Sequence, residues 1–101
     1  MNLDELVNLV CKTLELDKQT LFTSKRTEKY SDARFIIAKI AKDQKTKEGL
    51  PVFRYIDISK LFGRKTHKSA LDWEYNCNEF IKTDKKFREK YNLVISKLEN
   101  Y

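Results

Sequence analysis

The chain has 101 residues, of which 21 are Lys or Arg and 15 are Asp or Glu, so its formal net charge is +6. This length suffices for a single domain with one modest core, spanning residues 1–101. A basic balance of this size is typical of proteins that bind nucleic acid or an anionic surface. Only two glycines and one proline occur, which favours helices over turn-rich all-β folds.

Several classes of protein are excluded by local composition. The longest aliphatic and aromatic run, Phe35–Ala38, is far shorter than the roughly 20 residues of a membrane span. No cationic segment precedes an apolar stretch at the N-terminus, so no secretory signal is expected. Cys11 and Cys77 have no Cys or His at ligand spacing, which predicts reduced core residues rather than a metal site or a disulfide. Residues 63–66 lack the first glycine of a phosphate-binding loop, so we expect no nucleotide and no other cofactor.

Apolar residues at helical spacing predict an all-α bundle of five or six helices. Their expected ranges are about 2–14, 18–22, 31–44, 54–62, 66–82 and, after a cap at Thr83 or Asp84, up to about 98. Asp17, Ser31 and Thr66 stand where the second, third and fifth helices need their N-caps. The buried side of the fifth helix is expected to carry residues 70, 73, 77, 80 and 81, and Tyr75 is assigned to packing.

The connections between the helices carry two further signals. A basic loop at about 24–29 precedes the third helix, and a long connector at 43–53 follows it. Gly63 ends the fourth helix where a left-handed residue is needed, and Arg64 and Lys65 complete a tight turn. Two helices joined by a short, glycine-containing turn are typical of a helix-turn-helix.

The positive charge is concentrated in the middle of the chain. Residues 24–68 carry 13 Lys or Arg against 5 Asp or Glu, whereas residues 1–23 have a net charge of −2 and residues 69–101 are neutral. The predicted helix-turn-helix lies in this basic segment. A polyanion such as DNA is therefore the expected partner, with a general solubility surface as the alternative interpretation.

The run Ile58–Leu71 resembles the signature of the C-terminal DNA-binding domain of the bacterial replication initiator DnaA. The residues that match this signature in register are Ile58, Phe62, Gly63, Lys65, His67 and Leu71. The likeness extends over nearly the whole chain. It departs from the family at residues 66, 68 and 69, since the family's Asp-His-Thr-Thr reads Thr66-His67-Lys68-Ser69 here, and in a longer connector before the helix-turn-helix. The nucleotide-binding domain that precedes this module in DnaA is not part of the sequence, which leaves open a stand-alone protein or a domain of a larger initiator.

The resemblance implies that the helix at about 66–82 enters the major groove and that the loop at about 24–29 lies in the minor groove. Lysine can reach guanine, serine can donate or accept, and aspartate can accept from cytosine or hold a neighbouring lysine. The expected DNA-binding residues are Lys25, Arg26, Lys29, Lys42, Lys65, Thr66, His67, Lys68, Ser69 and Asp72. Arg26 stands where the family places a minor-groove arginine, and Lys42 would hold a backbone phosphate.

Together these observations predict sequence-selective binding of double-stranded DNA, in replication initiation or its regulation, by a cytoplasmic, nucleoid-associated protein. The family's mode of binding implies a monomer. The alternative is a protein-interaction module that retains the DnaA C-terminal fold without specific DNA reading. His67 is the only histidine, and no Ser, Cys or paired carboxylate stands at a diagnostic spacing from it. We therefore expect no catalytic residue, no metal site and no membrane contact.

Overall fold

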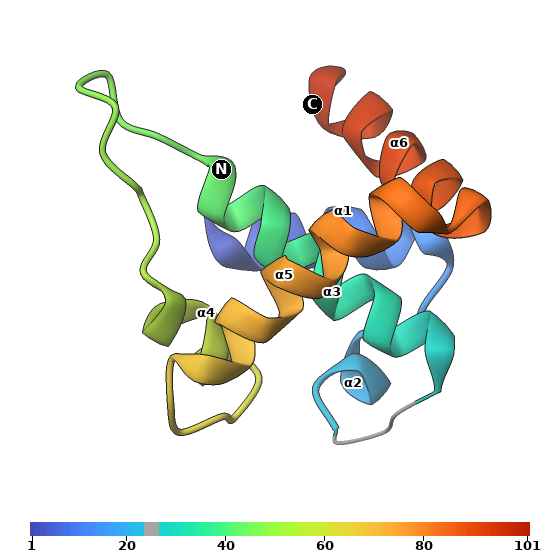
Figure 1. Ribbon diagram of the computed structural model, residues 1–101, viewed down its shortest axis with the longest axis horizontal. Helices are drawn as coiled ribbons and strands as arrows, with labels where there is room; N and C mark the ends of the chain where they lie inside the picture. Colours follow the sequence, from blue (N-terminus) through green and yellow to red (C-terminus); the bar gives the residue numbers. More distant parts are fainter. Residues whose placement is uncertain (24–26) are drawn as a thin grey trace.

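The computed structural model describes residues 1–23 and 27–101, and six α-helices follow one another in those ranges (Figure 1). They are α1 (Leu3–Leu14), α2 (Lys18–Leu21), α3 (Glu28–Asp43), α4 (Tyr55–Leu61), α5 (Lys68–Thr83) and α6 (Lys85–Glu99). The one extended pairing in the same ranges is an isolated antiparallel bridge between Lys45 and Pro51. The predicted all-α fold is therefore confirmed. None of the six helices is long and apolar enough to cross a membrane.

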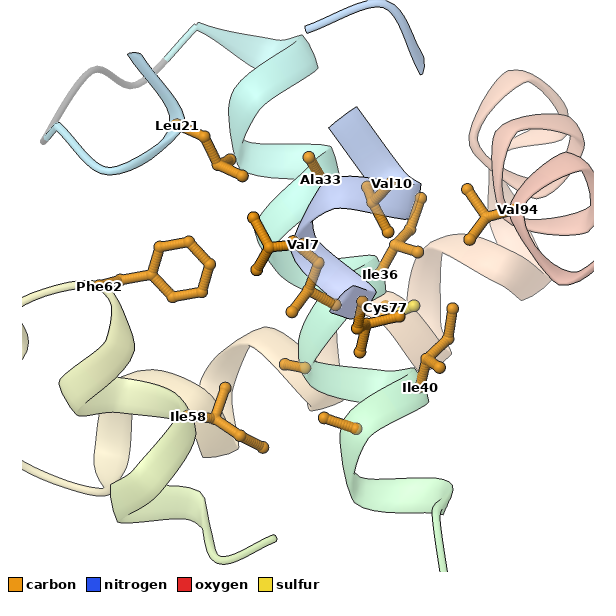
Figure 2. Close-up of a cluster of buried hydrophobic side chains, with 14 of the residues drawn as sticks. Val7, Val10, Leu21, Ala33, Ile36, Ile40, Ile58, Phe62, Cys77 and Val94 are labelled. Atoms are coloured by element: carbon orange, nitrogen blue, oxygen red, sulfur yellow. The ribbon is translucent and has the colours of Figure 1, made fainter. Parts of the chain in front are cut away.

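Helix α3 forms the centre of the bundle, because α1, α2, α4 and α5 all pack against it. Figure 2 shows the resulting core, to which Val10 of α1, Ile36 of α3, Ile58 of α4, Cys77 of α5 and Val94 of α6 contribute. Both cysteines are free and buried, as the sequence predicts. Burial raises the pKa of the Cys77 thiol to about 12, so this side chain stays protonated at neutral pH.

Local capping chemistry sets two of the helix starts as predicted. The Asp17 carboxylate accepts a hydrogen bond of 2.9 Å from the Thr20 N–H and begins α2. Of the two residues considered for the last helix, Asp84 is the one used, since its carboxylate accepts from the Phe87 N–H at 3.1 Å. Both contacts satisfy an N–H group that has no partner inside its own helix.

The predicted start of α3 is wrong by three residues, because the helix begins at Glu28 after an N-cap at Thr27 rather than at Ser31. Tyr30 explains the earlier start. Its ring is buried, and its hydroxyl oxygen accepts a hydrogen bond from the Asp17 N–H at 3.3 Å. Helical backbone before Ser31 brings this side chain onto the start of α2, and Glu28 suits the positive end of the helix dipole.

The predicted start of α5 and two side-chain placements on it are also wrong. The helix begins at Lys68 after His67, so Thr66 is not its N-cap, and six residues (62–67) connect α4 to α5 instead of three. Phe80 is 38% exposed at the edge of the bundle, although its ring lies 5.9 Å from that of Phe35. Tyr75 is 63% exposed and does not pack into the core. Phe80 therefore packs against Phe35 of α3 and Phe87 of α6 without being enclosed by them.

Asp32 gives the fold a pH dependence that the sequence did not suggest. Its side chain is 10% exposed and accepts a hydrogen bond of 2.9 Å from the Lys90 ammonium, which joins α3 to α6. Burial raises the pKa of this carboxyl above its ordinary value, and the hydrogen bond from Lys90 offsets only part of that rise. The folded chain therefore holds this proton more tightly than the unfolded chain does.

The Asp32 contribution to stability is thus present at low pH and is lost as the pH rises through the folded-state pKa. We expect Asp32→Asn to remove this loss, so that the unfolding free energy of the variant rises relative to wild type as the pH increases above about 4, the ordinary pKa of an aspartate. Urea unfolding followed by circular dichroism at several pH values measures the difference. If the unfolding free energy of the variant instead falls relative to wild type as the pH rises, the Lys90 contact outweighs the cost of burying the carboxylate.

Candidate nucleic-acid interface

The connection between α4 and α5 begins with a left-handed turn at Gly63. Its φ is +71°, a value that residues with a Cβ adopt only at a cost, so the predicted role of this glycine is confirmed. The Gly63 N–H donates to the Lys60 carbonyl at 3.0 Å, and the Arg64 N–H donates to the Ser59 carbonyl at 3.0 Å. This pair of bonds is a Schellman motif, which satisfies the last carbonyls of α4. The chain therefore leaves α4 in a fixed direction.

Ser59 also fixes the start of α5. This side chain is fully buried, and its hydroxyl accepts a hydrogen bond of 3.0 Å from the Ala70 N–H. Ala70 lies in the first turn of α5, where N–H groups have no partner within the helix. The cap that Thr66 was expected to supply thus comes from the preceding helix. One residue, Ser59, holds both ends of the connection through its carbonyl and its hydroxyl.

We expect Ser59→Ala to destabilise the fold by about 1–3 kcal/mol, because the buried Ala70 N–H would lose its acceptor. Ser96→Ala on the exposed side of α6 is a matched control and should change stability by less than about 0.5 kcal/mol. Chemical denaturation of both variants measures the difference. Equal losses of stability in the two variants would show that the hydrogen bond to the Ser59 hydroxyl does not stabilise the fold.

The residues predicted to contact the major groove lie together at the exposed start of α5 and in the connection that precedes it. Lys65, Thr66, His67 and Lys68 are all exposed, and Ser69 is half-buried. The Lys68 ammonium lies 2.9 Å from an Asp72 carboxylate oxygen, which is the intrahelical pair that the sequence offered as one alternative. Because Asp72 holds Lys68, the two side chains present a fixed donor and acceptor pair on the first turns of α5.

Two of the other predicted residues, Lys29 and Lys42, lie on α3. Lys29 is exposed on its first turn, with its ammonium 5.5 Å from the centre of the Tyr30 ring. Lys25 and Arg26 lie outside the described residues. Lys42 lies at the other end of α3, where its ammonium donates to the Phe53 carbonyl at 3.0 Å. The structure therefore does not bring Lys42 together with the residues of the helix-turn-helix.

A hollow of about 300 Å³ separates the first turns of α3 from those of α5. Its lining residues come from three elements and are Ser31, Arg34, Phe35, Arg64, Ser69, Asp72, Trp73 and Asn76. Arg34 is buried behind it and donates to the carbonyls of Leu21 (3.1 Å) and Thr23 (2.9 Å) at the end of α2. The hollow is therefore polar, and it connects the beginning of α3 with the exposed end of α5.

Comparison with known proteins finds a protein that is similar to this chain in sequence. The chain is 27% identical over 100 residues to the chromosomal replication initiator protein DnaA of Aliarcobacter butzleri (strain RM4018), an alignment that covers 99% of this chain. The chain resembles DnaA. The resemblance noted around Gly63 is thereby confirmed, and it includes all six helices. The chain spans about a fifth of the length of that DnaA, since the alignment covers 20% of it. No protein-family model matches the chain.

Sequence reasoning, including the DnaA signature, missed four residues of this surface. Arg64 was treated as a turn residue, yet its guanidinium lies 5.9 Å from the centre of the Trp73 ring and lines the hollow. Its Nε is buried and has no hydrogen-bond partner within the described part of the chain. Asn76 lines the same hollow, while Leu71 and Tyr75 are exposed on α5. The spacing of 68, 71, 72 and 75 marks one face of a helix and was the available signal.

Within residues 1–23 and 27–101, no three His, Cys, Asp or Glu side chains gather as metal ligands. What the arrangement supplies is a set of cationic and hydrogen-bonding side chains on an exposed helix end. Such a set can pair with phosphate oxygens and with the edges of bases.

Proposed function

We propose that this protein binds double-stranded DNA with sequence selectivity through its helix-turn-helix. The observation that carries the proposal is the exposed cationic end of α5, which lies at the C-terminal end of the segment that holds the whole excess of positive charge. Similarity to the replication initiator DnaA supports the same conclusion. We infer a role in replication initiation or its regulation, on the nucleoid of the cytoplasm and with one molecule per site.

In this proposal α5 enters the major groove with its first two turns. Lys65 and His67 contact phosphates, which positions the helix without reading sequence. Lys68 donates to guanine O6 or N7, with Asp72 holding its ammonium in place at 2.9 Å. Ser69 and the exposed apolar face of Leu71 then complete the contact, the latter against a thymine methyl group.

The loop at 24–29 is proposed to lie in the adjacent minor groove. An arginine such as Arg26 is attracted to a narrow A·T-rich minor groove by its negative potential. Lys25 and Lys29 would flank it on the phosphates. Arg34 supports this assignment indirectly, because its buried guanidinium ties the end of α2, just before the loop, to α3.

The experiment that tests the proposal is a fluorescence anisotropy titration of labelled DNA at several salt concentrations. A duplex with a DnaA box, a scrambled duplex of equal composition and the single strand are compared. Preference for the box duplex, with log K falling by about 0.9 per phosphate contact as log salt rises, is the expected result. Equal binding to both duplexes would mean that α5 reads a different sequence. No binding at low salt would overturn the proposal and favour a protein-interaction module.

A further inference from the structure

The connector between α3 and α4 forms a projecting hairpin, which we define as residues 44–52. The Thr46 N–H donates to the Leu50 carbonyl at 2.8 Å, and the Val52 N–H donates to the Gln44 carbonyl at 3.1 Å. Gly49 closes the tip with a φ of +83°. Figure 1 shows this segment extending from the end of α3, away from the bundle, before it returns to α4. The hairpin is thus an ordered element rather than a plain linker.

The base of the hairpin is attached to the proposed DNA-binding unit. Lys42 donates to the Phe53 carbonyl at 3.0 Å, and its ammonium lies 4.2 Å from the centre of the Tyr55 ring. The Tyr55 hydroxyl in turn donates to Glu74 on α5 at 2.6 Å. These contacts connect the hairpin to α4 and α5. Its orientation is therefore coupled to that of the helix proposed to enter the major groove.

The side chains of the hairpin contribute little to the core. Lys45 and Lys47 are exposed and carry positive charge, with one acid, Glu48, between them and the tip. Leu50 is 62% exposed and Val52 is 45% exposed, two large apolar side chains next to an exposed proline. A hairpin that carries lysines together with exposed apolar residues has the composition of elements that enter a minor groove. There the lysines contact phosphates and an apolar side chain inserts between bases.

We propose that the 44–52 hairpin is a second double-stranded DNA contact, which enters the minor groove on the far side of the major groove read by α5. Lys45 and Lys47 contact the phosphates, and Leu50 inserts between two base pairs and kinks the duplex. This inference rests on the proposed function of the helix-turn-helix. Charge complementarity selects DNA as the occupant, since Lys45 and Lys47 are exposed in the same hairpin as Leu50, with the Lys45 ammonium donating to the Lys42 carbonyl at 3.2 Å.

The position of the hairpin supports a contact distinct from that of the 24–29 loop. The hairpin follows the C-terminal end of α3, whereas Thr27, which lies in the loop, is the N-cap at the N-terminal end of this helix. The 16 residues of α3 separate these two ends by about 24 Å. Since a major groove is about 12 Å wide, contacts at the two ends of α3 can reach the minor grooves on either side of it.

The test compares wild type with Leu50→Ala and with the pair Lys45→Ala and Lys47→Ala. Leu93→Ala serves as the matched control, because Leu93 is also a large exposed apolar residue but lies on α6. Each protein is titrated onto a DnaA-box duplex of about 30 base pairs, roughly three helical turns. Energy transfer between dyes at the duplex ends measures bending, and hydroxyl-radical cleavage maps the protected grooves. Thermal unfolding checks that each variant is folded.

Wild type should bend the duplex and protect a minor groove on each side of the major-groove site, one through the 24–29 loop and the other, about half a turn away, through the hairpin. Leu50→Ala should lose most of the bend but keep protection at the major-groove site, and the lysine pair should lower the salt slope by about 1.8. Leu93→Ala should match wild type in both readouts. Duplex binding that is the same in all four proteins would overturn the hairpin contact and leave the helix-turn-helix proposal standing. A wild type that binds no duplex would overturn both.

Discussion

Replacing Lys65 and Lys68 together by glutamate should weaken duplex binding at least about 100-fold, a loss of about 2.8 kcal/mol. Both side chains are exposed at the end of α5, so each substitution exchanges a favourable phosphate or base contact for a repulsive one. The slope of log K against log salt should fall by about 0.9, because the phosphate contact of Lys65 disappears. Anisotropy titration at several salt concentrations measures both quantities.

The same double substitution should leave the fold intact. Lys68→Glu removes the contact with Asp72 and places two acids four residues apart, which costs a few tenths of a kcal/mol in an exposed helix. A glutamate in the first turn of α5 is at the same time favoured by the helix dipole. Thermal unfolding should therefore give a melting temperature close to that of wild type.

Lys85→Glu with Lys86→Glu is the matched control for this experiment. These two exposed lysines begin α6, far along the chain from the basic segment, and the substitution changes the net charge by the same amount. We expect it to weaken binding only slightly, through the long-range field. Equal losses in the two double variants would mean that binding depends on total charge alone. Unchanged binding in the Lys65 and Lys68 variant would exclude the helix-turn-helix as the DNA-binding surface.

The sequence predicts those parts of the fold that depend on local chemistry. Asp17, Gly63 and Asp84 could be assigned correctly because each acts on groups within four residues of itself. The start of α5 could not, because its first turn is capped by Ser59, eleven residues upstream on another helix. The start of α3 depends in the same way on Tyr30, which packs against a residue thirteen positions away. Capping rules applied along the chain do not include such partners.

The same distinction between neighbouring and distant residues applies to the candidate site. Lys65 and Lys68 could be placed on one surface because they are neighbours in the sequence, beside a recognisable turn. Arg64 and Asn76 line one hollow with residues of α3 only because α5 packs against α3. Lys42 belongs to a residue type that often contacts phosphate. In this fold its ammonium instead donates to the Phe53 carbonyl and lies over the Tyr55 ring. A count of charges cannot distinguish a free lysine from one that the fold already uses.

The largest effect on stability is expected at Phe87, the bulkiest fully buried side chain. It enters the core from the first turn of α6, and its ring lies 5.6 Å from that of Phe80. We expect Phe87→Ala to cost about 3–5 kcal/mol, from the lost burial and the cavity left behind. Since a domain of this size is stable by about 5–15 kcal/mol, the melting temperature should fall by at least roughly 12 °C. Thermal and urea unfolding measure this change.

Two further variants separate the causes of that loss. Phe87→Leu keeps most of the volume and should cost less than about 1.5 kcal/mol. Phe80→Ala removes the same ring contact from a side chain that is 38% exposed, so it leaves a smaller cavity and should cost about 1–2 kcal/mol. A loss from Phe80→Ala as large as that from Phe87→Ala would assign the energy to the ring contact rather than to burial.

Phe87→Ala also tests whether the proposed DNA contacts depend on packing in this part of the core. Phe87 lies where α6 meets the far end of α5, whereas the proposed DNA contacts lie at the beginning of α5. At a temperature where the variant is still mostly folded, its DNA affinity should therefore fall only by the fraction of unfolded chain. A larger fall would mean that α6 controls the orientation of α5. The helix-turn-helix would then owe its geometry to the whole bundle and not only to the Ser59 contacts.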